Sequence, residues 1–250
     1  MKKALLLAVV IAAAIAFPTA ATAGIFHGVV IAKDKSRHAL VIASRGHVRT
    51  IRTHATTRVS SRVSVHARRL GDGTFRGSDL SRAGRAHKTR FQAVVVAKSR
   101  HKLVVSAGRS TFDVHMASRH RGVGRGDRVV LNVSFSKSGE LDEDSMEEVG
   151  HSNTIELEGT VTALTQPTSG QAGSLTLTSE DDNNQGNDDN QGDENNGSTS
   201  FTVVIPAGFD ASGLKVGDQA ELTASVSGST LTLVSLDDEG GGGGDGGGGD

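Results

Sequence analysis

Residues 91–98 read FQAVVVAK, and closely similar segments occur twice more in this chain of 250 residues. The earlier copy is FHGVVIAK at residues 26–33, and the later copy is LEGTVTA at residues 157–163. Similar segments that recur after 65 and 66 residues indicate a repeated structural unit. Each copy is short, contains β-branched residues and lacks proline, which is typical of a β-strand. The pattern therefore predicts a β protein with three repeats.

Four further strands are expected in each repeat. Second strands begin at Leu40, Leu103 and Leu175, third strands begin at Val48, Phe112 and Phe201, and a Gly turn precedes each fifth strand. The segment VGRGDRVVL at 123–131 matches LKVGDQAEL at 214–222 and places a Gly-Asp turn before the fourth strand, a motif that the first repeat lacks. Five strands in about 60 residues are too few for an open sandwich, whereas a small barrel leaves no exposed edges. Gly28 and Gly159 would allow the bend that closure needs.

On these motifs the chain resembles the tandem small β-barrel domains, OB-like in layout, of exported bacterial proteins of uncharacterised function. The shared motifs are the Gly-x-Val-x-Ala first strand, the Phe-x-Val third strand, the Val-Gly-Asp turn and the closing Gly-x-Leu-x-Leu. The resemblance covers about residues 26–236. It implies an all-β fold of three tandem five-stranded OB-like barrels after a cleaved signal helix, and it implies no activity.

The repeats and the changes in composition divide the chain into segments. We expect no order in the insertion at 180–200, because it has no apolar residue to offset the entropy cost of ordering. The predicted segments are a signal peptide at 1–23, a basic barrel at 24–76, a linker at 77–90, a second basic barrel at 91–141, an acidic linker at 142–154, a third barrel at 155–236 and a disordered Gly/Asp tail at 237–250.

The N-terminus has the pattern of a secretory signal peptide. Lys2 and Lys3 precede an apolar run at 4–17, and Ala21-Thr22-Ala23 is a small-residue cleavage site before Gly24. The run has 14 residues, short of the roughly 20 that a membrane span needs. We therefore expect a chain without a membrane span after signal removal, secreted or held in the cell envelope or periplasm. The absence of cysteine excludes disulfides and cysteine nucleophiles.

The net charge of −1 is the sum of two opposed halves. Residues 24–138 contain 24 Lys and Arg against five acids, while residues 139–250 contain 23 acids and one base, Lys215. Arginine favours bidentate contacts with phosphate, sulfate or carboxylate groups. OB-type barrels often bind oligomers beside the loop after the first strand. The candidate anion-binding residues are Arg37, His38, Arg100, His101 and Lys102 in those loops and Arg49, Arg52 and Arg62 in the third-to-fourth strand region, which also contains Arg58, Arg68 and Arg69.

These residues predict an exported, non-catalytic binding or scaffolding protein for an acidic polymer: a cell-wall polymer, a polysaccharide or extracellular DNA. With no Trp or Tyr, base stacking is not expected, so binding would depend on backbone charge and on salt. The acidic half could mask the basic half or join molecules head to tail.

Two alternatives stay open: calcium association through the acidic loop and tail, and a purely structural array. A real EF-hand is excluded because Gly192 stands where a bidentate Glu is required. The histidines have no metal-site spacing and no Gly-x-Ser-x-Gly elbow is present, so no metal, cofactor or enzyme activity is expected.

Overall fold

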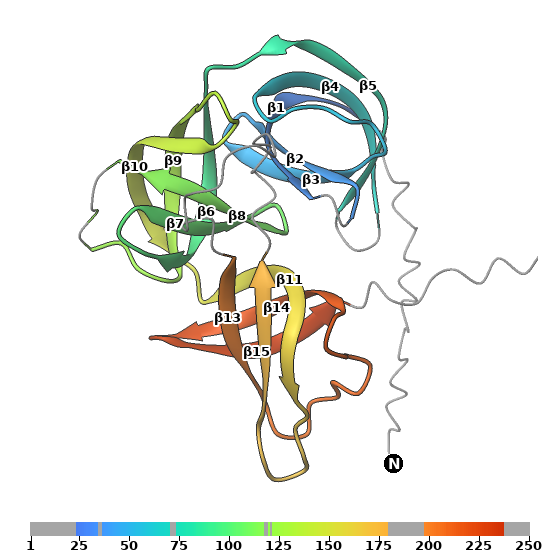
Figure 1. The fold of residues 1–250 in the computed structure, drawn as a ribbon, viewed down its shortest axis with the longest axis vertical. Helices are drawn as coiled ribbons and strands as arrows, with labels where there is room; N and C mark the ends of the chain where they lie inside the picture. The colour runs from blue at the N-terminus through green and yellow to red at the C-terminus, as the bar shows by residue number, and fades with distance from the viewer. Residues whose placement is uncertain are drawn as a thin grey trace, which may run out of the picture.

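The computed structural model describes residues 24–34, 37–70, 74–117, 120, 122–179 and 198–237, and in these ranges all regular structure is β-strand. The strands form three closed five-stranded barrels, coloured blue to teal, green, and yellow to red in Figure 1. Barrel 1 contains β1 (Gly24–Asp34), β2 (Ala39–Ser44), β3 (His47–Arg52), β4 (Ser61–Arg69) and β5 (Phe75–Arg85). Barrel 2 contains β6 (Lys88–Lys98), β7 (Lys102–Ala107), β8 (Ser110–Met116), β9 (Asp127–Phe135) and β10 (Leu141–His151). Barrel 3 contains β11 (Thr154–Thr165), β12 (Gly173–Ser179), β13 (Thr199–Ile205), β14 (Gln219–Ser227) and β15 (Thr230–Asp237).

The three barrels share one topology. In each, the strand order is first, second, third, fifth and fourth, and the fourth strand pairs back with the first. The third and fifth strands are parallel, and every other neighbouring pair is antiparallel. This order confirms the expected all-β fold of three tandem small OB-like barrels.

The first strand of every barrel has a β-bulge at the same place. The register shifts between Val30 and Ala32 in β1, and at the matching positions in β6 and β11. A bulge bends a strand and increases its twist, which lets one strand pair with two neighbours in a small barrel. Gly28 has another role than the expected bend: a Cβ there would lie 2.5 Å from the carbonyl oxygen of Ala43. The glycine therefore allows β1 and β2 to approach closely.

The turn before the fourth strand is also common to all three barrels. The amides of Gly126 and Gly217 donate 2.8 Å hydrogen bonds to the carbonyls of Val95 and Val161, with φ of 87° and 97°. In barrel 1 the amide of Ser60 donates a 2.8 Å hydrogen bond to the carbonyl of Val30, and Ser60 has a φ of 71°. The first repeat therefore keeps the turn, with serine in the left-handed conformation that glycine adopts without strain.

The two segments expected to be linkers are strands, which corrects the domain boundaries. Most of 77–90 belongs to β5 and to the start of β6, and most of 142–154 belongs to β10. Only residues 86–87 and 152–153 connect the barrels. These strands are polar over most of their length, so their composition resembles that of linkers, but pairing with β4 and β9 orders them.

Other expectations concern the ends of the chain and the acidic insertion. The insertion falls between β12 and β13 as expected, but Thr199 and Ser200 belong to β13. Residues 180–197, the signal peptide at 1–23 with Ala21 and Ala23, and residues 238–250 lie outside the described residues, and Gly24 begins β1. In the described part of the chain, no helix has the length and apolar character of a membrane span.

Adjacent barrels share hydrophobic clusters. Ile31 and Val41 of barrel 1 pack in the same buried cluster as the core of barrel 2. Val96 and Val104 of barrel 2 belong in turn to the core cluster of barrel 3. These residues lie on strands whose outer face would be solvated in an isolated barrel, and burying such apolar area stabilises the assembly of the three barrels.

Candidate anion-binding surface

The barrel boundaries change where the positive charge lies. Residues 24–85, which form barrel 1, contain 13 Lys and Arg against three acids. Residues 88–151 contain 11 bases against eight acids, because the acidic strand β10 belongs to barrel 2. Residues 154–237 contain one base and 13 acids. The expectation of two strongly basic barrels is therefore wrong, and barrel 1 carries most of the excess charge.

Three arginines form a row across neighbouring strands of barrel 1. Arg52 of β3 pairs in register with Arg76 of β5, and Arg76 pairs with Arg68 of β4. Their neighbours Ile51 and Ala67 are buried, so the alternation of a strand directs the three arginines outward. Since paired strands lie about 4.8 Å apart, the row concentrates three positive charges on a narrow strip.

More arginines extend this surface along β4 and β5. We call the exposed arginines of β4 and β5 the arginine ribbon. The acid that β5 carries among them, Asp79, lies 3.5 Å from the Nδ1 of His66. The ribbon consists of Arg62, Arg68, Arg69, Arg76, Arg82 and Arg85.

The strand of barrel 2 that corresponds to β5 is β10, and it carries acids where β5 carries arginines. Asp144 and Glu147 are two of these acids. Lys88 of β6 lies 2.9 Å from Asp144, and Arg90 lies 3.9 Å from Glu147. Positive and negative groups thus alternate across barrel 2, whereas Arg68 and Arg76 face each other in barrel 1. Like charges directly opposite each other destabilise a sheet, so the arrangement in barrel 1 has an energetic cost.

Arg49 lies at the end of barrel 1 where β1, β3 and β5 begin. Its guanidinium carbon lies 4.1 Å from the centroid of the Phe26 ring and 5.5 Å from that of Phe75. The two rings form an edge-to-face pair with centroids 5.1 Å apart. Partial burial against them lowers the pKa of Arg49. Of the predicted residues, Arg52 and Arg62 thus lie on the β3–β5–β4 surface, and Arg49 covers an aromatic pair.

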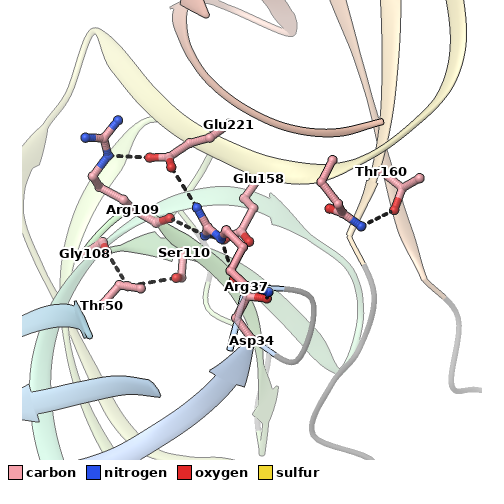
Figure 2. A network of polar contacts seen from close by, with 10 residues as sticks. Asp34, Arg37, Thr50, Gly108, Arg109, Ser110, Glu158, Thr160 and Glu221 are labelled. Atoms are coloured by element: carbon pink, nitrogen blue, oxygen red, sulfur yellow. Dashed lines mark hydrogen bonds and ion pairs between the residues drawn. The ribbon is translucent and has the colours of Figure 1, made fainter. Parts of the chain in front are cut away.

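Arg37 has a structural role that the sequence did not indicate (Figure 2). Its Nε donates to Asp34 at 2.5 Å and its Nη1 donates to Glu221 of barrel 3 at 2.7 Å, while Nη2 pairs with Glu158. The side chain is 8% exposed. Arg109 of barrel 2 also pairs with Glu221. Arg37 therefore joins the barrels, and its inclusion in an exposed anion-binding surface is corrected.

The junction around Arg37 holds more carboxyl groups than guanidinium groups. Burial, and then a hydrogen bond with Asp34, raise the pKa of Glu158 to about 9. Burial opposes the charge of Arg37, but Glu158, Asp34 and Glu221 outweigh that effect and raise its pKa. The raised pKa of Glu158 means that the junction favours the neutral form of this carboxyl group.

The junction between barrels 1 and 2 is closed by neutral groups as well. The hydroxyl of Thr50 in β3 donates to the carbonyl of Gly108 at 2.5 Å and lies 2.9 Å from the hydroxyl of Ser110. The amide of Gln92 donates to the carbonyl of Gly46 at 2.9 Å. These bonds fix the orientation of barrel 1, and hence of its arginines, relative to barrel 2.

The remaining predicted residues are spread over two barrels. His38 is exposed just before β2, with its ring 5.5 Å from that of His54. Arg100 and His101 are exposed before β7 on barrel 2, and Lys102 pairs with Asp113. Arg76, Arg82 and Arg85 were not predicted at the site, because the sequence from residue 77 onward has the composition of a linker and Arg76 stood at the end of the predicted barrel. A period-two alternation through 75–85 would have been the signal, and the bulges in β5 pairing obscure it.

The assignment of the barrels rests on the strand pairing and not on comparisons with known proteins. No protein-family model matches the chain, and no curated protein matches it in sequence. A multidomain protein with nucleic acid binding domains from Streptococcus pneumoniae is 13% identical over 86% of this chain and 73% of that chain, with a TM-score of 0.22. Tetrameric p202 HIN2 is 11% identical over 59% of this chain and 88% of that chain, with a TM-score of 0.21. TM-scores this low carry no argument about function.

Two further expectations concern cations. Among the described residues, no group of three or more His, Asp or Glu is arranged to hold a metal ion. The acidic loop of the calcium alternative lies almost entirely outside those residues, so that alternative stays a prediction.

Proposed function

We propose that the protein is a non-catalytic, exported array of OB-like barrels that binds an acidic polymer on the outer face of β3, β5 and β4. The row of Arg52, Arg76 and Arg68 is the observation that carries this proposal. The near-neutral overall charge of the protein does not require like charges to lie in register. Because this arrangement costs stability, we expect it to serve binding. The negative charges of an acidic polymer lying across the row would attract the three arginines and offset the repulsion between them.

The chemistry of the ribbon suits phosphate or sulfate groups along a backbone. Each guanidinium presents a planar fork of donors that matches such oxyanions bidentately. The ribbon follows β4 and β5 along their length, so successive charges of an extended polymer could meet successive arginines. The aromatic pair Phe26 and Phe75 lies under Arg49, not on the ribbon, so this mode reads charge and not bases.

The choice of polymer follows from the expected export of the protein. The signal-peptide pattern at 1–23 would place the barrels where cell-wall polymers, acidic polysaccharides and extracellular DNA occur. The acidic barrel 3 would then oppose weak, unspecific association, because its charge repels the same polymers.

The test compares two double variants with the same loss of charge. In residues 24–250, Arg68→Gln/Arg76→Gln removes two members of the ribbon, and Arg100→Gln/Arg128→Gln removes two exposed arginines of barrel 2. Binding of single-stranded DNA, a teichoic acid and a sulfated polysaccharide is measured at 50 mM salt by fluorescence anisotropy or calorimetry. We expect the ribbon variant to lose at least about tenfold in affinity and the control to lose less than about threefold.

The proposal is wrong if all three polymers fail to bind the unmodified protein at low salt. Equal losses in the two variants would also contradict it, because binding would then follow total charge and not the ribbon.

A further inference from the structure

Barrel 1 has a pocket of about 630 Å³ at the end opposite Arg49. The end of β1, the start of β2 and the connection from β3 to β4 surround it, and Arg82 of β5 lies at its edge. Its volume falls within the range of roughly 300–1,000 Å³ that is common for small-molecule sites. The pocket is separate from the Arg52, Arg76 and Arg68 row, none of which lines it.

The matching connection in barrel 3 carries different side chains. Between β13 and β14, Ala211 is 3% exposed, and Phe209 and Leu214 pack against the core of that barrel. These apolar side chains cover the core at the point that corresponds to the pocket. In barrel 1 the connection at 53–60 has threonines, a histidine and an arginine at this place.

The lining is positively charged and rich in hydroxyl groups. One acid lines the pocket, Asp34, and its carboxylate is bonded to Arg37. Arg82 donates a hydrogen bond to the carbonyl of Thr56, which ties the connection to β5. The basic residues of the lining are Lys33, His38, His54, Arg58 and Arg82.

Thr57 is the most informative residue of the lining. It is 5% exposed, and its Oγ1 is buried without a hydrogen-bond partner in the described structure. A buried hydroxyl left unpaired destabilises the fold, so a ligand that accepts its hydrogen bond gains affinity. Because this oxygen is buried, a small shift of the Thr57 side chain would let its hydroxyl bond an oxyanion of a ligand in the adjoining basic pocket.

We propose that this pocket binds a small phosphorylated sugar or a compound of similar size and chemistry. Arg58 and Arg82 would pair with the phosphate, and Thr57 would donate its hydroxyl hydrogen to a phosphate oxygen. The histidines and threonines of the connection would bond the hydroxyl groups of the sugar. The volume leaves room for more than a phosphate ion, and the basic side chains of the lining favour an anionic ligand.

The site is tested with three probes on residues 24–250, observed by NMR and calorimetry. The probes are inorganic phosphate, glucose 1-phosphate and glucose. We expect glucose 1-phosphate to bind most tightly, inorganic phosphate at least about tenfold more weakly, and glucose not to bind at millimolar concentration. The amide signals of residues 53–58 should shift on binding.

Three variants locate the binding. Thr57→Val should weaken glucose 1-phosphate about fivefold, as expected for one lost hydrogen bond, and Arg58→Gln about tenfold or more. Thr57→Val removes an unpaired hydroxyl, so it should fold at least as stably as the unmodified protein. The ribbon variant Arg68→Gln/Arg76→Gln should bind glucose 1-phosphate within twofold of the unmodified protein, which separates this inference from the proposed polymer site.

The inference is overturned if neither phosphate probe binds, or if Thr57→Val and Arg58→Gln both bind as tightly as the unmodified protein. Equal affinity for inorganic phosphate and glucose 1-phosphate would overturn the assignment of a sugar. Loss of binding in the ribbon variant alone would place the phosphate on the polymer surface instead.

Discussion

Arg37 and Glu221 are 184 residues apart in the sequence, yet the Nη1 of Arg37 donates a 2.7 Å hydrogen bond to the Oε2 of Glu221. The second oxygen of the same carboxylate pairs with Arg109. One glutamate of barrel 3, 4% exposed, thus bonds an arginine of barrel 1 and an arginine of barrel 2. The relative positions of the three barrels depend on this buried group as well as on the shared hydrophobic clusters.

Removal of Arg37 should destabilise the protein strongly. Arg37→Met keeps much of the side-chain volume but removes the guanidinium that pairs with Asp34 and Glu158, and it leaves Glu221 with Arg109 alone. Breaking a buried pair in this way costs about 3–5 kcal/mol. Urea unfolding measures the loss, and Arg62→Met, at an exposed position, should change stability by less than about 0.5 kcal/mol. Similar stability of the two variants would show that the junction contributes little.

Stability should fall between pH 6 and pH 9 because of Glu158. Burial first, and then the hydrogen bond with Asp34, raises its pKa from 4.5 to about 9 in the folded protein. A raised carboxyl pKa means that the folded state holds the proton more tightly than the unfolded chain does. Its stabilising contribution is therefore complete below about pH 4.5 and is lost as the pH rises through about 9. Burial raises the pKa of Glu156 as well, which acts in the same direction.

Glu158→Gln tests this assignment. The amide resembles the protonated carboxyl group and can still donate to Asp34, but it does not titrate. We expect the free energy of unfolding of this variant to vary less between pH 6 and 9, and to exceed that of the unmodified protein at pH 9 by at least about 1 kcal/mol. Asp127 and Asp144, whose pKa values are lowered, titrate in acid and do not disturb this window. Parallel pH profiles for the two proteins would exclude Glu158 as the cause.

Ser60→Gly should stabilise barrel 1. Ser60 has a φ of 71° at a turn where Gly217 of barrel 3 has a φ of 97°. Glycine would remove the left-handed strain of about 1–2 kcal/mol while adding entropy to the unfolded chain, so we expect a net gain of about 0.5–1 kcal/mol. Gly217→Ser is the reciprocal variant and has open space around its Cβ, so it should lose about 1 kcal/mol through the backbone alone. Thermal unfolding that shifts in the same direction for both variants would contradict this explanation.

Polymer binding should depend on salt through the arginine ribbon. Each arginine that neutralises a phosphate of single-stranded DNA adds about 0.7 to the slope of log affinity against log salt concentration. Arg68→Gln/Arg76→Gln should therefore reduce the slope for single-stranded DNA by about 1.4. The barrel 2 variant Arg100→Gln/Arg128→Gln should leave it nearly unchanged, and an unchanged slope in the ribbon variant would mean that the polymer lies elsewhere.

Repetition made the architecture predictable. The first strands recur after 65 and 66 residues, and a Gly-Asp turn precedes the fourth strand in two of the three repeats. The strand boundaries were less predictable. Polar strands such as β5 and β10 have few inward apolar residues, so local composition could not distinguish them from linkers.

The candidate sites were predicted in part. Arg52 and Arg62 lie on the β3–β5–β4 surface as expected, but Arg37 lies in the junction, and Arg76, Arg82 and Arg85 were not expected at the site. Composition shows that a segment is basic and does not show which arginines face each other, because strand register determines that. The pocket beside Thr57 could not be predicted, since it depends on how the connection at 53–60 folds over the end of the barrel.

The sequence by itself determined the class of fold, the number of barrels and the opposed charges, because strand periodicity and turn chemistry are local properties. The tertiary structure decided which charged residues form the exposed surface and which are buried in ion pairs. Closure of the barrels assigned β10 and its acids to barrel 2, register aligned Arg52, Arg76 and Arg68, and packing enclosed Arg37 among carboxyl groups. Pairing and burial join residues far apart in the chain, and the energy of a charge depends on those neighbours and on its exposure to water.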